Sequence, residues 1–289
     1  MKTKLSFYTL GILSFLGVQG QEDLLSTLKK SQDTVFYTAA TFKTTRISIG
    51  HSLETRKQGI VQASIMTRYW DMPAPTGNSF VADKMTARFG IDYAFSDRFT
   101  LGGGMATLDG IADGFAKFRL IRQRSDNKPW LGLTIVQTVS YRTRNFNNLN
   151  ETDGVIDKLS FTSQLLIGRK FTRNFSLQIS PTFIHRGSSR LAEDDINHFA
   201  IGFGGRYKLS NHLSLVSEYY WITNPLESRN TFGAFALGTN WELGDLILQF
   251  KLTNARNFAE DTFITQTPVN FNTKRGNLSF GFQANYIIH

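Results

Sequence analysis

The sequence contains no cysteine, only six prolines and, after Gly20, no long apolar run. Without cysteine the chain has neither disulfide bonds nor the residue that carries a lipid anchor after export. Without a run of roughly 18 apolar residues it has no membrane-spanning helix. The chain is therefore either a soluble exported protein or a membrane protein that crosses the bilayer with strands.

The N-terminus has the order of a secretory signal peptide. Lys2 and Lys4 precede an apolar stretch, residues 5–18, which is too short to cross a bilayer, and Gly20 supplies a small residue for cleavage. We predict that residues 1–20 are a signal peptide, so that the chain is exported and these residues take no part in the fold.

Acidic residues are fewer than basic ones. Lys and Arg number 32, or 30 once Lys2 and Lys4 are removed, against 23 Asp and Glu. The basic residues are spread over many segments instead of one element, which argues against a nucleic-acid partner. Outer-membrane lipid and lipopolysaccharide, which carry anionic headgroups, are the partners we expect for basic residues near the rims.

From residue 59 onward, apolar and polar residues alternate with the period of two that predicts β-strands. Phe175 and Leu177, for example, lie on the opposite face from Ser176 and Gln178. We predict twelve strands, at residues 60–69, 85–95, 99–107, 114–122, 130–142, 158–169, 175–186, 198–209, 213–222, 231–241, 246–253 and 277–288. No helical period of comparable length follows the signal peptide.

A short turn motif recurs along the chain, as FSDRFTLGGG at residues 95–104, FTRNFSLQIS at 171–180 and LSNHLSLVSE at 209–218. The copies begin at Phe95, Phe171 and Leu209, so the second interval is half as long as the first. The shorter interval fits one up-and-down hairpin with its loop. The motif therefore marks the end of one strand, a tight turn and the start of the next strand.

Short and long connections alternate between the predicted strands. The short ones are 96–98, 123–129, 172–174, 210–212 and 242–245, and the long ones are 70–84, 107–113, 143–157, 187–197, 223–230 and 255–276. Tight periplasmic turns and longer outer loops are typical of bacterial outer-membrane barrels. We predict an all-β, up-and-down antiparallel transmembrane β-barrel of about 12 strands over residues 59–289.

A soluble β-sandwich or lipocalin-like barrel shows the same alternation with its apolar side inward. Three features favour the membrane. The strands have the length of a tilted crossing, and the polar faces are rich in Gly, Ser, Thr and Gln. Aromatic residues also gather near strand ends as in an interfacial girdle, namely Tyr69, Trp70, Tyr93, Phe95, Trp130, Tyr141, Tyr219, Trp221, Trp241 and Tyr286.

Residues 21–58 fit no strand of this kind. Residues 21–30 are compatible with a short helical turn, and residues 34–50 are rich in threonine without a continuous apolar face. Three alternatives remain open for residues 21–58: an insert in the lumen, a periplasmic segment and a disordered leader.

A resemblance to a known protein family rests on three segments. They are ATFKTTRISIGHSLE at residues 40–54, FGIDYAFSDRFTLGGG at 89–104 and DGFAKFRLIRQ at 113–123. With them the chain resembles a Bacteroidetes-type outer-membrane β-barrel family of unknown function, over essentially the whole mature chain. The resemblance implies a barrel in the outer membrane and supports a transport or envelope role, but it brings no established activity and no catalytic residues to carry over. Many such barrels end on an aromatic residue that is used in assembly, whereas this chain ends on His289. Tyr286, three residues earlier, is the aromatic residue that could serve instead.

If the apolar faces meet lipid, the opposite faces line the lumen. We predict as lumen-lining residues Arg68, Arg88, Asp92, Lys117, Arg119, Arg142, Arg186, Arg206, Lys208, Glu218 and Lys251. A wall with an excess of one charge sign attracts ions of the opposite sign. The same cations could instead pair with carboxylates or with residues 21–58 and close the lumen, and about twelve strands leave an interior of intermediate size.

Catalytic and metal sites are weakly indicated. His185 with Ser188 and Ser189 at a strand end invites comparison with barrel lipases, but no Asn follows in the expected arrangement. Residues 193–195 lack the spacing of a calcium loop, and His51, His198, His212 and His289 are too scattered for a transition-metal site. We expect no enzyme activity, no cofactor and no bound metal.

We therefore predict an outer-membrane barrel that passively transports a small anionic or amphipathic solute. The alternative is a plugged barrel that acts as an envelope scaffold or complex partner, with a periplasmic protein as its possible partner. An outer-membrane phospholipase is the distant third hypothesis.

Overall fold

The computed structural model describes residues 36–72, 76, 82–144, 154–189, 191, 193–272 and 277–289. The predicted signal peptide and residues 21–35 lie outside the described residues.

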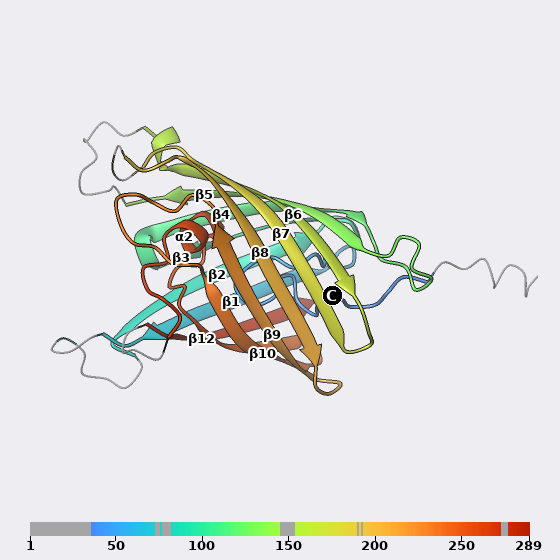
Figure 1. Cartoon of the computed structure of the whole chain (residues 1–289). Coiled ribbons are helices and arrows are strands. Elements are labelled where there is room, and N and C mark those ends of the chain that lie inside the picture. The colour runs from blue at the N-terminus through green and yellow to red at the C-terminus, as the bar shows by residue number, and fades with distance from the viewer. Residues whose placement is uncertain are drawn as a thin grey trace, which may run out of the picture.

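Twelve antiparallel strands close into one barrel, in which each strand pairs with its neighbours in sequence and β1 pairs with β12 (Figure 1). The strands are β1 (Val61–Trp70), β2 (Lys84–Ala94), β3 (Phe99–Ala106), β4 (Ile111–Ile121), β5 (Gly132–Arg142), β6 (Leu159–Lys170), β7 (Phe175–Arg186), β8 (Asn197–Lys208), β9 (Leu213–Ile222), β10 (Phe235–Leu243), β11 (Leu246–Thr253) and β12 (Ser279–Ile288). The predicted up-and-down barrel of twelve strands is confirmed.

The apolar side chains lie on the outside of the barrel. Phe89 and Ile135 are 54% and 44% exposed, whereas their sequence neighbours Arg88 and Thr134 are buried. Hydrocarbon offers no hydrogen-bond partner to a backbone amide or carbonyl, and a closed sheet pairs these groups between its own strands. Both the backbone and the apolar wall therefore suit a lipid environment, and a soluble sandwich with a dry apolar interior is excluded.

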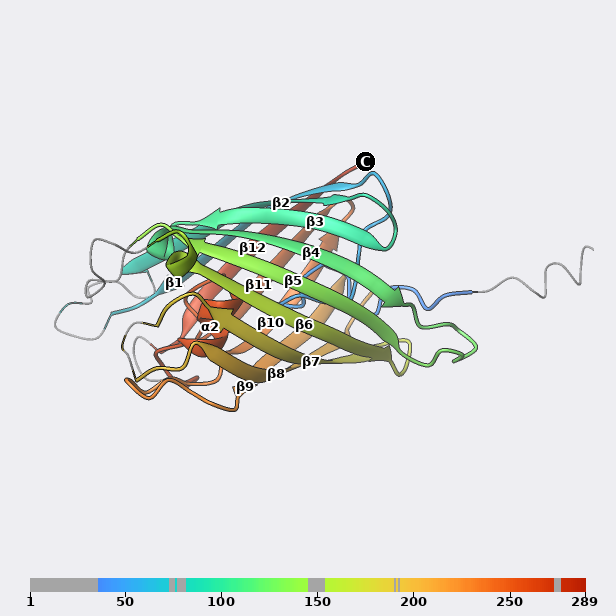
Figure 2. The ribbon, with the colours of Figure 1, turned by 90° about the horizontal axis from the view of Figure 1, so that it is seen from above.

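Both predicted kinds of connection occur, on opposite rims. Four of the five connections at the rim that carries the C-terminus are tight turns, whereas most of the loops at the other rim are long (Figure 2). The exception is the β4–β5 connection at residues 122–131, which is longer than the predicted 123–129. One long connection was predicted wrongly, because only residues 107–110 separate β3 from β4, and they include the 3-10 turn η1 (Leu108–Gly110). Asp109 and Gly110 both adopt positive φ there, which lets the chain reverse tightly.

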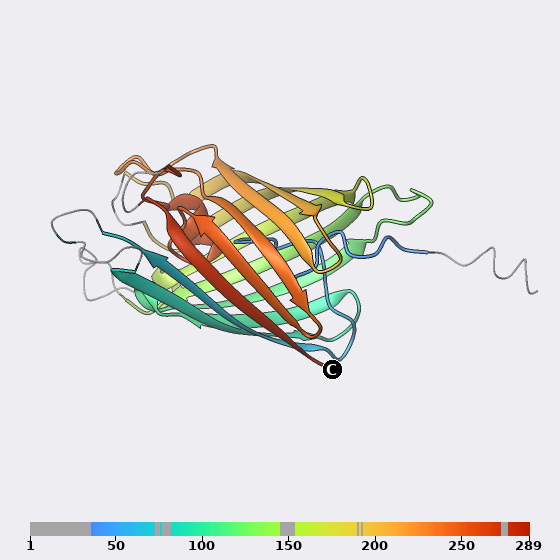
Figure 3. The same cartoon turned by 90° about the horizontal axis from the view of Figure 1, so that it is seen from below.

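Two segments lie inside the barrel. Residues 41–53, which we name the N-terminal insert, enter from the short-turn rim, and nearly all of them are buried (Figure 3). Residues 254–267, which we name the outer insert, fold back from the long-loop rim and contain the helix α2 (Glu260–Thr265). The sequence predicted residues 255–276 as a long connection but did not predict that it folds inward. No helix among the described residues is long and apolar enough to span a bilayer.

Trp70 departs from the predicted aromatic girdle. Tyr93, Trp130, Tyr219, Trp221, Trp241 and Tyr286 are exposed on the outer surface, as expected for interfacial aromatics. Trp70 is only 6% exposed, because it is the last residue of β1 and alternation places it on the inner face. It therefore lines the mouth of the lumen at the long-loop rim.

Candidate functional site

The predicted lumen-lining residues occupy two kinds of position. Nine are buried on the inner face of the wall: Arg68, Arg88, Asp92, Lys117, Arg119, Arg186, Arg206, Glu218 and Lys251. Arg142 and Lys208 end their strands at opposite rims and are half-buried, and the Lys208 ammonium donates to Asn211 Oδ1 at 3.1 Å.

Glu218 of β9 holds the turn of the N-terminal insert. Its carboxylate accepts hydrogen bonds from the backbone amides of Ser48 and Ile49 at 2.7 and 2.5 Å, and from that of Gly50. Gly50 packs so closely on Tyr220 that a Cβ atom there would overlap the Tyr220 hydroxyl. A carboxylate that accepts several amide hydrogen bonds is a strong, directional anchor, so Glu218 positions this turn.

Cations of β4 hold the same insert from another part of the wall. The Lys117 ammonium donates to the backbone carbonyls of Thr45, Ser52 and Glu54 at 2.8, 3.0 and 3.3 Å. Arg119 makes an ion pair of 2.9 Å with the Glu54 carboxylate. The wall thus satisfies backbone carbonyls in the insert and directly after it, where no regular secondary structure pairs them.

Apolar contacts add to this anchoring. Phe42, Ile47 and Leu53 of the N-terminal insert form one buried cluster with the inward-facing wall residues Phe115, Val136, Leu166 and Val216. Each fully buried side chain of this size contributes roughly 1.5–3 kcal/mol. The N-terminal insert is therefore docked by both kinds of contact.

The outer insert is held by Arg68 and Arg186. Arg68 donates to the carbonyls of Ala255, at 2.9 Å, and Asn257, and its guanidinium lies 4.4 Å from the centre of the Phe258 ring. Arg186 donates to Thr265 Oγ1 at 3.1 Å. These contacts fix the outer insert near the long-loop rim.

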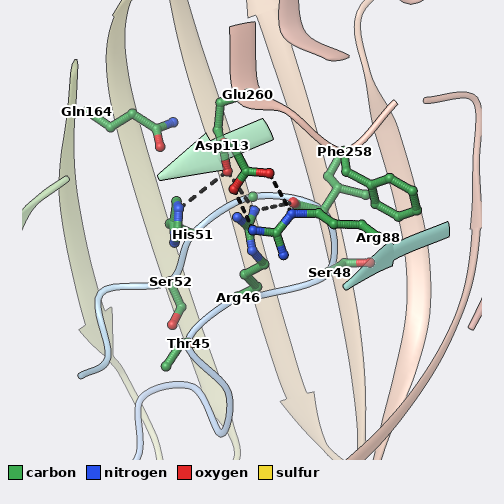
Figure 4. A network of polar contacts seen from close by, with 12 residues as sticks. Thr45, Arg46, Ser48, His51, Ser52, Arg88, Asp113, Gln164, Phe258 and Glu260 are labelled. Carbon is green, nitrogen blue, oxygen red and sulfur yellow. Dashed lines mark hydrogen bonds and ion pairs between the residues drawn. The ribbon is translucent and has the colours of Figure 1, made fainter. Parts of the chain in front are cut away.

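The two inserts meet at Glu260 of α2 (Figure 4). Arg46 Nη1 lies 2.6 Å from Glu260 Oε1, and His51 Nε2 lies 3.4 Å from the same oxygen. Beside them the wall residues Arg88 and Asp113 form a bidentate ion pair, with 2.7 Å between Arg88 Nε and Asp113 Oδ2. Charged groups from both inserts and from the wall thus form one buried network.

The surroundings of His51 in this network favour its neutral form. Burial, followed by the positive charges of Arg46, Lys117 and Arg88, lowers the pKa of the His51 imidazole well below its ordinary value. These effects outweigh the Glu260 carboxylate at 3.4 Å. A proton on His51 would therefore disturb the junction between the inserts.

Sequence reasoning missed two carboxylates of this network. Asp113 faces inward because it lies two residues before Phe115 and four before Lys117 on the same strand, and alternation alone could have placed it. Glu260 lies in a predicted loop, where periodicity gives no direction. Its role follows only from the inward fold of residues 254–267.

The residues considered for catalysis do not assemble a triad. Contrary to the sequence prediction, an Asn does reach His185, since Asn197 Oδ1 lies 2.8 Å from His185 Nδ1. Ser188, however, donates its hydroxyl to the Asp157 carbonyl and Ser189 to the Leu191 carbonyl. Asp194 accepts from Ser228, and the described residues contain no group of three or more side chains suited to a metal ion.

A comparison with protein families matches residues 42–287 to the membrane bound beta barrel domain family (DUF5777). The chain belongs to this family. As a DUF5777 protein it is membrane-bound, and its closed sheet with an apolar outer wall is the architecture of outer-membrane proteins. The predicted location in the outer membrane is confirmed. No curated protein matches the chain.

Solved structures similar to this DUF5777 barrel include outer-membrane channels. The KdgM porin has 9% sequence identity and a TM-score of 0.49, covering 78% of this chain and 99% of its own. The COG4313 outer membrane channel from Pseudomonas putida F1 has 15% identity and a TM-score of 0.48, covering 82% and 98%. With identities and scores this low, nothing about the cargo or mechanism of these channels is carried to the DUF5777 chain.

Proposed function

We propose that this protein is an outer-membrane channel for small anionic solutes, closed here by its two inserts and opened when the N-terminal insert leaves the lumen. The observation that carries the proposal is the charge of the wall. The buried charged residues on the described strands are seven cations (Arg68, Arg88, Lys117, Arg119, Arg186, Arg206 and Lys251) and three carboxylates (Asp92, Asp113 and Glu218).

The energetic argument concerns what a permanently closed barrel would need. Buried charges are often replaceable by apolar side chains with no loss of stability, or with a gain of ~1–4 kcal/mol. An apolar filling would therefore close the lumen at least as well as this one. A charged wall is useful when water and ions reach it, because Lys117 and its neighbours then exchange insert carbonyls for water or a solute anion.

Withdrawal of the N-terminal insert would leave a wall with excess positive charge. Lys117 and Lys251 now donate to backbone carbonyls of Thr45 and Ser48. In an open lumen these ammonium groups would face solvent, and a low-dielectric wall of one charge sign concentrates counter-ions. Anion selectivity follows from this arrangement.

A second candidate is a closed barrel that serves as an envelope scaffold for a periplasmic partner. Occupation of the lumen from both rims favours it. At the short-turn rim, residues 36–38 also pair with the β4–β5 turn, where Thr38 donates to the Gln123 carbonyl at 2.9 Å, and the Phe36 side chain is exposed. An exposed aromatic on a paired segment offers a surface to a partner protein.

Planar-bilayer conductance separates the two candidates. We compare the refolded wild-type chain with Glu218→Gln plus Glu260→Gln, which weakens the anchors of both inserts, and with Asp126→Asn as a control in an exposed turn. The channel proposal expects long-lived openings with anion preference in the double variant and rare ones in the other two. Silence in all three folded proteins rejects the channel and leaves the scaffold.

The remaining proposals concern identity and partners. We propose that the protein is not an enzyme, that it comes from a Bacteroidetes-type envelope, and that outer-membrane lipid and lipopolysaccharide contact its basic rims. A periplasmic partner protein remains a proposal tied to the scaffold candidate, and nucleic acid is not proposed as a partner.

A further inference from the structure

A cavity of about 250 Å³ lies at the long-loop rim, where the outer insert meets the barrel wall. Trp70, Asp109 and Arg229 line it from the wall and loops, and Arg256, Asn257 and Phe263 line it from the outer insert. The charged network around Glu260 lies deeper in the barrel, between the two inserts. Its residues do not line this cavity, whose role is therefore a separate question. Its lining combines aromatic surface with cations.

The cations are positioned by the surrounding residues. The Arg256 guanidinium lies over the indole of Trp70, 5.1 Å from the ring centre. Arg229 Nη2 donates to Gln266 Oε1 at 2.9 Å. Side chains held in this way lose little further conformational freedom when a ligand arrives, which favours binding.

Among the described residues that line the cavity, positive charges outnumber negative ones. Two guanidinium groups line it against one carboxylate, Asp109, whose Oδ2 already accepts a hydrogen bond of 3.2 Å from Asn257 Nδ2. Guanidinium groups bind planar carboxylates and phosphates well, because their donors match the geometry of these anions. The Trp70 side chain, which also lines the cavity, adds apolar surface for the body of the same ligand.

Building on the channel function above, we propose that this cavity is the outer binding site of the solute and that it takes a small organic monoanion with a ring body. The anionic group is bound by Arg229 and Arg256, and the ring packs on Trp70. A cavity of 250 Å³ is smaller than most sites for drug-sized ligands, roughly 300–1,000 Å³. It therefore suits a molecule of one ring and not an oligomer.

The position of the cavity links binding to the inserts. Arg256 and Asn257 belong to the segment that Arg68 holds, and Phe263 belongs to the helix that contains Glu260. A ligand between Trp70 and the outer insert would therefore contact the segment that closes the lumen. Binding itself does not require the lumen to open.

The test is calorimetric titration of the full mature chain in detergent micelles with four probes. Benzoate and glucuronate are anions with an aromatic and a sugar ring, benzyl alcohol is the neutral ring control, and acetate is the anion without a ring. We expect one or both ring anions to bind at least about tenfold more tightly than both controls, and more weakly as salt is added. Equal binding of benzoate and benzyl alcohol, or no binding of either ring anion, overturns the proposal.

Variants then locate the site. Arg256→Gln and Trp70→Leu are expected to lower the affinity for the ring anion about tenfold or more. Arg169→Gln is the matched control, because the Arg169 guanidinium lies 5.1 Å from the Trp130 ring centre at the opposite rim. Unchanged affinity in folded Arg256→Gln overturns the site. If that variant does not fold, Arg229→Gln takes its place.

Conductance separates this proposal from the channel itself. Ring-anion binding that depends on Arg256, in a protein that never conducts, keeps the site and rejects the channel. Conductance in a protein that does not bind ring anions through Arg256 keeps the channel and rejects the site.

Discussion

Arg46 and Glu260, which are 214 positions apart in the chain, form an ion pair of 2.6 Å in the middle of the barrel. Their side chains are 6% and 0% exposed, so the pair is shielded from water. One residue belongs to the N-terminal insert and the other to the outer insert. A change at one rim of the barrel can therefore affect the segment that enters from the other rim.

Removal of this link should loosen both inserts. In Glu260→Gln the Arg46 guanidinium loses its charged partner, and breaking a buried pair costs about 3–5 kcal/mol. We expect faster hydrogen exchange in residues 44–52 and 257–265, measured by mass spectrometry of the protein in micelles.

The matched control for this variant is Asp126→Asn. Asp126 pairs with Arg124 at 2.7 Å, but water reaches both side chains, so the loss of this pair should change stability little. Exchange in Glu260→Gln that equals exchange in Asp126→Asn would show that the Arg46–Glu260 pair does not couple the inserts.

The contact of Gly50 with Tyr220 tests how tightly the N-terminal insert fits. Gly50→Ala would place a methyl group against the Tyr220 hydroxyl, and overpacking of this kind costs roughly 1–3 kcal/mol. We expect faster proteolysis within residues 41–58. Gly114→Ala is the control, because its new Cβ would lie 3.8 Å from its nearest neighbours, and cleavage as slow as in this control would contradict the close fit.

Acid should weaken docking of the N-terminal insert through His51. The pKa of the docked imidazole lies below the ordinary value of 6.5, so the undocked state binds more protons as the pH falls below 6.5. The stabilising contribution is therefore complete above that pH and is lost below it. Relative to the intrinsic exchange rate at each pH, which itself falls in acid, the protection of residues 44–52 against hydrogen exchange should decrease between about pH 7 and about pH 5.

His51→Gln provides the control for this pH dependence. Glu260 faces the imidazole from the outer insert, Arg46 from its own segment, and Lys117 and Arg88 from the wall. If the acid-induced exchange persists unchanged in His51→Gln, another of these groups is responsible.

Because Phe89 faces outward, a charged side chain in its place should destabilise the barrel by an amount that depends on its depth in the bilayer. Phe89 lies at the middle of β2 and is exposed, so Phe89→Arg should destabilise the barrel in lipid by about 2–4 kcal/mol. Tyr93→Arg, near the end of the same strand, should cost about 0–1 kcal/mol. Reversible urea unfolding in vesicles measures both, and equal losses would argue against a lipid-facing wall.

The barrel could be predicted from the sequence because strand periodicity is local. Phe175, Leu177 and Ile179 reveal their shared face without knowledge of any other strand, and the recurring turn reveals the hairpin length. Trp70 was placed on the wrong surface because aromatic residues near strand ends suggest a girdle, whereas alternation along β1 decides its direction. The short connection at residues 107–110 was missed although Asp109-Gly110, both of which adopt positive φ, is a local signal for a tight hairpin turn.

The candidate site was predicted only in part. The wall cations followed from alternation, and nine of the eleven proposed lumen residues are buried on the inner face. The partners of the wall residues could not be predicted in this way. Glu218 binds the backbone amides of Ser48 and Ile49, and Lys117 binds backbone carbonyls. Such groups are present at every residue and carry no sequence signal.

The sequence by itself determined a closed antiparallel barrel with its apolar face toward lipid. Hydrocarbon leaves the backbone no partner outside the sheet, and a period of two assigns each side chain to one face. Only the tertiary structure decided what occupies the lumen. The inserts are held by contacts between residues far apart in the chain, such as Arg46 with Glu260, and by backbone groups that no local pattern distinguishes.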